Sequence, residues 1–228
     1  MTPSSRSRVD HLVVAAQTLD EGVQWCEAIL GVTPRAGGEH PFMGTHNRLL
    51  KIASESYPRA YFEIIAINPD AKAPGRPRWF DLDDPELREA VRQQPRLVHF
   101  VASTTEASPA LKALHRLGID RGPLIHAERP TPESMLRWQI SVREDGQRLF
   151  YGALPTLIEW GDAHPADAMP SSGLALQSLH AAHPRLADLQ AAHAAIGLEG
   201  VTVEQGPPNL VATLSTPKGT VILESAGT

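Results

Sequence analysis

The sequence lacks several features that would assign it to a particular class of protein. Its single cysteine, Cys26, rules out an internal disulfide and lies in a helical pattern, where a small core residue is expected. No run of about 18 apolar residues is present, so we expect no membrane-spanning helix. Residues 1–8 are polar and lack the apolar segment of a secretion signal. Together these absences predict a cytoplasmic protein.

Positive charge is not concentrated in any part of the chain. The formal net charge is −5, and the 21 Lys and Arg residues are scattered. A nucleic-acid partner, which needs a basic patch or stripe, is therefore not expected. With 228 residues, 42% of them hydrophobic, the chain is long enough for a sizeable core. We expect a small-molecule substrate as partner and no membrane, with a homodimer as one option.

Three segments of the chain share one pattern, in which a short apolar run is followed by an amphipathic helix that ends at a glycine. The apolar runs begin at Val9, Leu97 and Leu174, and the closing glycines are Gly31, Gly118 and Gly197. The spacing is nearly constant, because the glycine lies 20 residues after His11, 19 after His99 and 19 after Ser178. Such self-similarity indicates a supersecondary unit that is used more than once.

Helix starts can also be read from the sequence. Thr18 with Glu21 three residues later is typical of a capping box at the first helix. Ser108 followed by Pro109 predicts the N-cap and first turn of the second helix.

Each segment continues with sequence typical of strands and closes on an apolar strand that carries a glutamate. These glutamates are Glu63, Glu159 and Glu224. Each segment therefore predicts the order β-α-β-β-β, and the fold class is α+β. We expect module 1 at residues 9–67, a connecting segment with a short helix at 68–96, module 2 at 97–162 and a degenerate module 3 at 172–226.

Four ionisable residues stand where apolar side chains would be expected. His11 and His99 occupy matching places in the first strands of two segments, and Glu63 and Glu159 occupy matching places in the last strands. A buried carboxylate is costly unless a cation or a hydrogen-bond donor partners it. Two imidazoles and two carboxylates make a plausible set of ligands for a divalent first-row metal. The alternative is that each histidine is a satisfied core residue.

This arrangement resembles the vicinal oxygen chelate superfamily, and within it the glyoxalase-like domain family. The local likeness rests on Asp10–Val13, Gly38–His40, Gly44–Asn47 and Tyr61–Ile64, and it weakens through the second and third segments. The resemblance implies repeated βαβββ modules that form a curved mixed sheet, a bowl with helices on its outer face. It also implies a divalent metal (Ni, Zn, Fe or Mn) at the floor of the bowl, bound by His11, Glu63, His99 and Glu159. The alternative is a site without metal.

The third segment departs from this pattern, because Ser178 stands where the histidine would be. We expect it to build no metal site. It either covers the other two segments or pairs across a dimer.

Other residues are candidates for binding substrate. His40, His46 and Asn47 would line the site, although they lie in turn-like sequence, where such residues also stabilise the backbone. Arg76, Arg78 and Trp79, in the connecting segment, would close over an anionic substrate or form an exposed basic loop.

The function that the resemblance implies is a lyase- or isomerase-type reaction on a small substrate with vicinal oxygens. Glu63 would be a firm metal ligand and Glu159 the general base of a metal-stabilised enediolate. An extradiol-type dioxygenase, with two histidines and one carboxylate on iron, is the first alternative. A metal-free binding protein of the drug-sequestering type is the second, and the low aromatic content, 5%, speaks against it.

Overall fold

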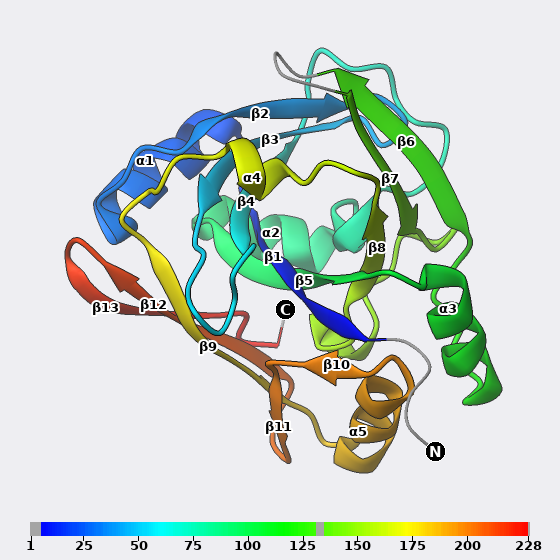
Figure 1. Cartoon of the computed structure of the whole chain (residues 1–228). Coiled ribbons are helices and arrows are strands. Elements are labelled where there is room, and N and C mark those ends of the chain that lie inside the picture. Colours follow the sequence, from blue (N-terminus) through cyan, green and yellow to red (C-terminus); the bar gives the residue numbers. More distant parts are fainter. Residues whose placement is uncertain (1–5, 131–134, 228) are drawn as a thin grey trace.

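The computed structural model describes residues 6–130 and 135–227, and their main feature is one strongly curled mixed sheet (Figure 1). Its first half holds β1 (Ser7–Ala15), α1 (Leu19–Leu30), β2 (Arg35–His40), β3 (Thr45–Lys51) and β4 (Tyr61–Ile67). Its second half holds β5 (Arg96–Thr104), α3 (Ala107–Arg116), β6 (Leu124–Pro130), β7 (Met135–Ser141) and β8 (Thr156–Trp160). The strand order is β2-β3-β4-β1-β5-β8-β7-β6. The predicted α+β class and curved mixed sheet are confirmed.

The two halves repeat one topology and meet along β1 and β5. In each half the first strand pairs in parallel with the last, β1 with β4 and β5 with β8. The junction between β1 and β5 is antiparallel, with His11 opposite Val101 and Val13 opposite His99. An approximate two-fold axis therefore passes through the pair Leu12–Phe100 and relates His11 to His99.

The predicted helix signals have different outcomes. Thr18 does cap α1, because its side chain accepts from the backbone N–H of Glu21 at 3.2 Å, and Gly31 ends the helix with φ 76°. The prediction that Ser108 caps the second helix is wrong. Helix α3 begins at Ala107, two residues before the predicted first residue Pro109, and the N–H of Ala107 donates to the Glu159 carboxylate instead.

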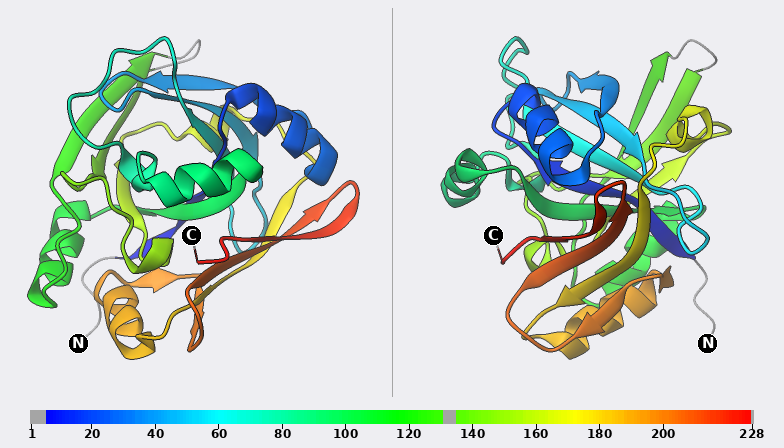
Figure 2. Two further views of the ribbon diagram at one scale, coloured as in Figure 1. Left: turned by 180° about the vertical axis from the view of Figure 1, so that it is seen from behind. Right: turned by 90° about the vertical axis from the view of Figure 1, so that its left-hand side faces the viewer.

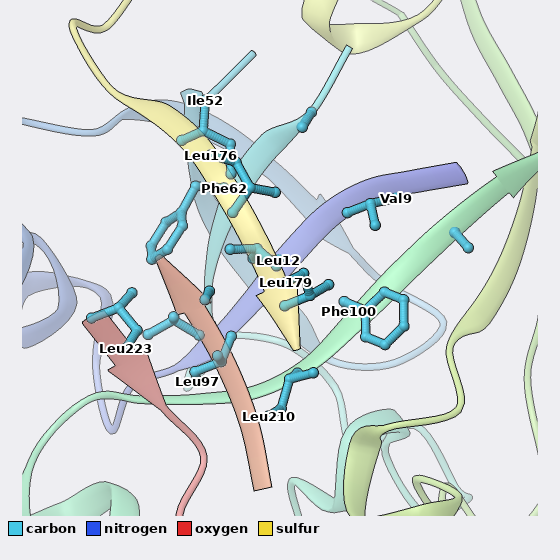
Figure 3. Close-up of a cluster of buried hydrophobic side chains, with 14 of the residues drawn as sticks. Val9, Leu12, Ile52, Phe62, Leu97, Phe100, Leu176, Leu179, Leu210 and Leu223 are labelled. Atoms are coloured by element: carbon cyan, nitrogen blue, oxygen red, sulfur yellow. The ribbon is translucent and has the colours of Figure 1, made fainter. Parts of the chain in front are cut away.

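The outer face of the curled sheet carries α1, α3 and the third segment. That segment holds β9 (Ala175–Ala182), α5 (Leu186–Ala195), β10 (Leu198–Glu199), β11 (Thr202–Glu204), β12 (Asn209–Thr216) and β13 (Gly219–Glu224). Leu176, Leu179 and Leu210 are fully buried against Leu12 and Phe100 of the large sheet (Figure 3). Each such side chain stabilises the fold by about 2 kcal/mol through burial. The third segment thus covers the outer face.

The third segment differs from the other two in strand pairing. Four of its strands form a second sheet in the order β11-β9-β12-β13, so β9 pairs with β11 and β12 and not with the last strand, β13. The short strand β10 pairs in parallel with β1 of the large sheet. The order of elements resembles a βαβββ unit, but the sheet that they build is a different one.

The connecting segment packs against the inner face of the curled sheet. It contains η1 (Trp79–Asp81) and α2 (Pro85–Gln93), which Asp84 caps by accepting from the N–H of Leu87 at 2.9 Å. Leu87 and Val91 of α2 are buried against Val13 and Val98, and seen from behind, α2 lies across the sheet (Figure 2, left). Much of the bowl is therefore filled by protein. None of the helices in the described parts is long and apolar enough to cross a membrane.

Candidate functional site

The site begins with a β-bulge in the first strand. Val9 pairs with Ala102 and His11 with Val101, so Asp10 is an extra residue without a partner in β5. A bulge of this kind bends a strand and redirects its side chains. Here it brings two neighbouring residues, Asp10 and His11, to one hydrogen-bonded cluster.

Asp10 is fully buried and accepts from three side chains. His11 Nδ1 lies 2.7 Å from Oδ1, and His164 Nε2 and Trp160 Nε1 each lie 2.9 Å from Oδ2. Burial alone would raise the pKa of Asp10, but the hydrogen bonds from His11 and His164 outweigh it and hold the pKa well below its usual value. Asp10 is therefore a carboxylate that fixes the His11 ring with Nδ1–H pointing backward and Nε2 pointing into the bowl.

Glu63 faces His11 from the neighbouring strand β4. Its Oε2 lies 3.6 Å from His11 Nε2, and both residues are only 5% exposed. Asn47 Nδ2 donates to Glu63 Oε1 at 2.6 Å, and the Asn47 carbonyl in turn accepts from the backbone N–H of Gly38 at 2.7 Å. The amide is thus held with its NH₂ toward the carboxylate.

A cavity of about 50 Å³ lies in front of this pair. Aromatic side chains form much of its wall, namely Tyr61, Trp79, Phe80, Trp138 and Trp160. His40 and Arg129, both half-buried, line it as well. Burial lowers the pKa of His40 to about 4, with the positive charge of Arg129 acting in the same direction and Glu63 against it. His40 is therefore a neutral wall residue near pH 7.

The matching histidine of the second half, His99, is enclosed. Its Nδ1 lies 3.0 Å from the carbonyl oxygen of Gly152, and its Nε2 accepts from the backbone N–H of Thr156 at 3.1 Å. Arg121 Nη2 lies 3.4 Å from the same Nε2. Burial and the Arg121 charge hold the pKa of His99 well below its usual value. Both ring nitrogens are used, so His99 has no lone pair for a metal.

The expectation that Glu159 matches Glu63 is corrected by strand register. Glu63 lies beside Val13, and the two-fold axis relates Val13 to Val101, whose partner in β8 is Thr156. Thr156 therefore occupies the place of Glu63 in the second half. Because side chains alternate along a strand, Glu159 points to the outer face, where it accepts from Ala107 N–H at 2.8 Å.

These residues do not fit the four-ligand metal centre expected from the sequence. Of His11, Glu63, His99 and Glu159, only the first two face each other. Within residues 6–130 and 135–227, no group of three or more His, Cys, Asp or Glu side chains is placed to hold a metal ion.

Of the predicted substrate-binding residues, some line the cavity and others do not. Asn47, His40 and Trp79 line the cavity. His46, which pairs with Ala66 of β4, lies on the other face of β3 from Asn47. Arg78 turns away, because its guanidinium and its backbone N–H both bond Asp83.

The sequence reading missed Asp10, His164, Arg129, Trp138 and Trp160. Asp10 had a signal, since a carboxylate beside His11 in an apolar strand needs a partner as much as Glu63 does. Trp160 had a weaker one, because it shares the strand face of Thr156. Arg129 and His164 had none, because only the closure of the sheet and the path of the chain after β8 bring them to the site.

Comparison with known proteins agrees with this fold. Residues 9–197 match the family model of the glyoxalase-like domain. The crystal structure of a hypothetical protein from Staphylococcus aureus is 15% identical, with TM-score 0.58, covering 96% of this chain and 84% of that one. Methylmalonyl-CoA epimerase from Streptomyces coelicolor, in complex with 2-nitronate-propionyl-CoA, is 16% identical with TM-score 0.43, covering 69% of this chain and 96% of that one.

The epimerase from Mycobacterium tuberculosis is 15% identical with TM-score 0.39, covering 70% of this chain and 91% of that one. No curated protein matches the chain. The family match spans most of the chain, including both halves of the curled sheet. The chain therefore belongs to the glyoxalase-like domain family.

Proposed function

We propose that this protein catalyses proton transfer on a small oxygenated substrate, an isomerase- or lyase-type reaction, with Glu63 and His11 as the acid–base pair. One observation carries the proposal. The Glu63 carboxylate and His11 Nε2 meet at 3.6 Å beside a small cavity, and each is fixed from behind, by Asn47 and by Asp10.

The hydrogen bonds orient both groups of this pair for proton transfer. Because Nδ1–H is committed to Asp10, a neutral His11 would direct a lone pair at a Glu63 oxygen. Two acceptors facing each other repel, and a proton on Nε2 removes this repulsion. We assign this proton to His11, whose ring hydrogen-bonds the Asp10 carboxylate through Nδ1, and the role of base to Glu63.

The pair can then move two protons in opposite directions. Glu63 takes a proton from the carbon next to the substrate carbonyl while His11 gives its Nε2 proton to the carbonyl oxygen, which yields a neutral enediol. Glu63 then returns its proton to the adjacent carbon, and His11 recovers a proton from the second hydroxyl. Groups positioned in this way contribute about 10²- to 10⁴-fold each to the rate.

No step of this reaction uses a metal bound by the four predicted ligands, because His99 is fully hydrogen-bonded and Glu159 lies on the outer face. The extradiol alternative meets the same obstacle, because it needs two histidines and one carboxylate, and His99 has both ring nitrogens engaged.

A second candidate function is binding without turnover, and the cavity wall favours it. Three of the four tryptophans of the chain line the cavity, although aromatic residues make up only 5% of the sequence. Flat apolar molecules stack on such side chains. The low overall aromatic content therefore argues less against a binding protein than it did from the sequence alone.

Solvent deuterium exchange tests the proposal without knowledge of the complete reaction. The protein is incubated in D₂O with hydroxyacetone, dihydroxyacetone, pyruvate or pyruvamide, and ¹H NMR follows loss of the C–H signal next to the carbonyl. We expect exchange above background with at least one compound, falling about 100-fold or more in Glu63→Gln. Glu159→Gln is the matched control, because that carboxylate lies on the outer face, and it should exchange like the wild type.

Two results would contradict the proposal. Equal exchange in wild type and Glu63→Gln would remove Glu63 from the chemistry. Saturable binding of aromatic compounds with no exchange of any substrate would favour the binding protein.

A further inference from the structure

Arg129 reaches the cavity from the far end of the curled sheet. It lies on β6, on the same face as Ala127. Arg129 pairs with Leu136 of β7, and Ala127 pairs with Trp138. Arg129, Leu136 and Trp138 all line the cavity. The guanidinium therefore points at the same space as His11 and Glu63.

The opposite end of the sheet is shaped to admit this side chain. A Cβ atom on Gly38 of β2 would lie 1.6 Å from Arg129 Nη1 and 2.7 Å from its Cζ. Strands β2 and β6 are the two ends of the sheet in strand order, and Figure 1 shows them approaching each other where it closes. Glycine at position 38 leaves room for the guanidinium to cross this gap.

Arg129 has no acidic partner within residues 6–130 and 135–227, unlike two other arginines of this half. Arg137, on the outer face of the same hairpin, pairs with Glu128 at 3.2 Å, and Arg148 pairs with Asp81 at 2.9 Å. Among the residues that the structure describes, no carboxylate forms an ion pair with Arg129. A half-buried cation that lines a cavity without a partner attracts an anion from solution.

We propose that Arg129 binds the carboxylate of the substrate, so that the substrates are small 2-oxo or 2-hydroxy carboxylic acids. This inference rests on the proposed function for the reaction, although binding itself does not require turnover. The planar guanidinium holds a carboxylate through two parallel hydrogen bonds, which orients the neighbouring carbon. In a 2-oxo acid this neighbouring carbon carries the carbonyl oxygen that His11 protonates, and the next carbon carries the proton that Glu63 takes. In a 2-hydroxy acid the neighbouring carbon itself carries that proton.

The size of the cavity agrees with this substrate class. About 50 Å³ is room for roughly three or four water-sized groups, enough for a carboxylate and the carbon attached to it. A longer substrate would extend past the half-buried rim formed by His40, Trp138 and Trp160.

Tryptophan fluorescence can measure this binding directly, because Trp79, Trp138 and Trp160 surround the cavity. The wild type is titrated with pyruvate and lactate, and with pyruvamide and methyl lactate as neutral analogues of the same shape. We expect saturable changes with the two acids and at least 10-fold weaker binding of the neutral compounds. Arg129→Gln should weaken binding of the acids at least 10-fold, and Arg129→Lys should restore part of it.

Two further variants separate local from general effects. Arg137→Gln removes a paired arginine from the outer face of the same hairpin and should bind like the wild type. Gly38→Ala should weaken binding as Arg129→Gln does, because the added methyl group displaces the guanidinium. Circular dichroism establishes that each variant is folded.

The inference is overturned if the neutral compounds bind as tightly as the acids, if no compound saturates, or if folded Arg129→Gln binds the acids unchanged. Failure of the proposed function gives a different result. In that case the acids bind through Arg129 with no deuterium exchange, or exchange continues at the same rate in Glu63→Gln.

Discussion

Replacing Asp10 by asparagine tests the centre of the site in both stability and chemistry. The carboxylate accepts from His164, Trp160 and His11, and the two histidines are only 5% exposed. An asparagine oxygen placed at Oδ2 keeps the bonds from His164 and Trp160 but loses their charge assistance. The difference between charged and neutral hydrogen bonds is about 1 kcal/mol each.

The third contact must be rebuilt. The asparagine NH₂ would face His11 Nδ1–H, and two donors cannot bond. His11 therefore loses its Nδ1 proton, so that Nδ1 accepts from the asparagine NH₂ and the ring becomes the neutral tautomer protonated on Nε2. This adjustment raises the total loss in free energy of unfolding to roughly 2–4 kcal/mol. For a chain of this length, each kcal/mol lowers Tm by about 2–4 °C, so we expect Tm to fall by roughly 5–15 °C.

Thermal and urea unfolding measure the loss, and ¹⁵N NMR of the His11 ring identifies the tautomer. Asp167→Asn is the matched control, since Asp167 forms an exposed pair with Arg59 at 2.8 Å, a contact worth about 0–1 kcal/mol. Exchange activity should fall by about 100-fold or more in Asp10→Asn, because its neutral His11 cannot return to the imidazolium as easily. A Tm within 2 °C of the wild type, or an unchanged tautomer, would refute this account of the cluster.

Three further predictions concern residues around the site. Glu159→Gln should lower the free energy of unfolding by about 1 kcal/mol, measured by urea unfolding, because the charged bond to Ala107 N–H at the start of α3 becomes neutral. The pKa of His40 is about 4 in the folded protein, against an ordinary value of 6.5 for the unfolded chain. Between these values only the unfolded chain binds the proton, so the free energy of unfolding should fall as pH drops from 6.5 to 4. This loss, up to about 3 kcal/mol in pH-dependent unfolding, should be absent in His40→Asn. Lys218→Met should cost about 1 kcal/mol in thermal unfolding, because Lys218 Nζ donates to the carbonyl oxygens of Glu27 and Ala28 near the end of α1.

Sequence periodicity is sufficient to predict the fold class because it reports local structure. The capping box at Thr18, the closing glycines and the apolar strands each depend on residues a few positions apart. The same reasoning placed Glu63 beside a histidine, since both interrupt strands that are otherwise almost continuously apolar. It failed for Glu159, because the last strand of the second half is displaced by three residues relative to the first. A glutamate near the end of an apolar run does not reveal its register, and register decides which face it occupies.

Other site residues depend on contacts that no local pattern contains. Arg129 reaches the cavity because the two ends of the sheet meet at Gly38, and His164 reaches Asp10 through the segment that follows β8. The metal expectation came from counting ligand types at matching positions. Whether a histidine is free to bind a metal depends on its second nitrogen and its neighbours, and for His99 these are Gly152, Thr156 and Arg121.

The two-fold relation between the halves explains why one histidine is a functional candidate and the other is structural. Both first strands carry a bulge, and the extra residue is Asp10 in β1 and Val98 in β5, each just before the histidine. The residue opposite the ring is Glu63 in the first half and Thr156 in the second. One half thus keeps a carboxylate behind its histidine and another in front, and the other half has neither. These two positions, together with the contacts of His99 to Gly152 and Arg121, separate an acid–base pair from a packed core histidine.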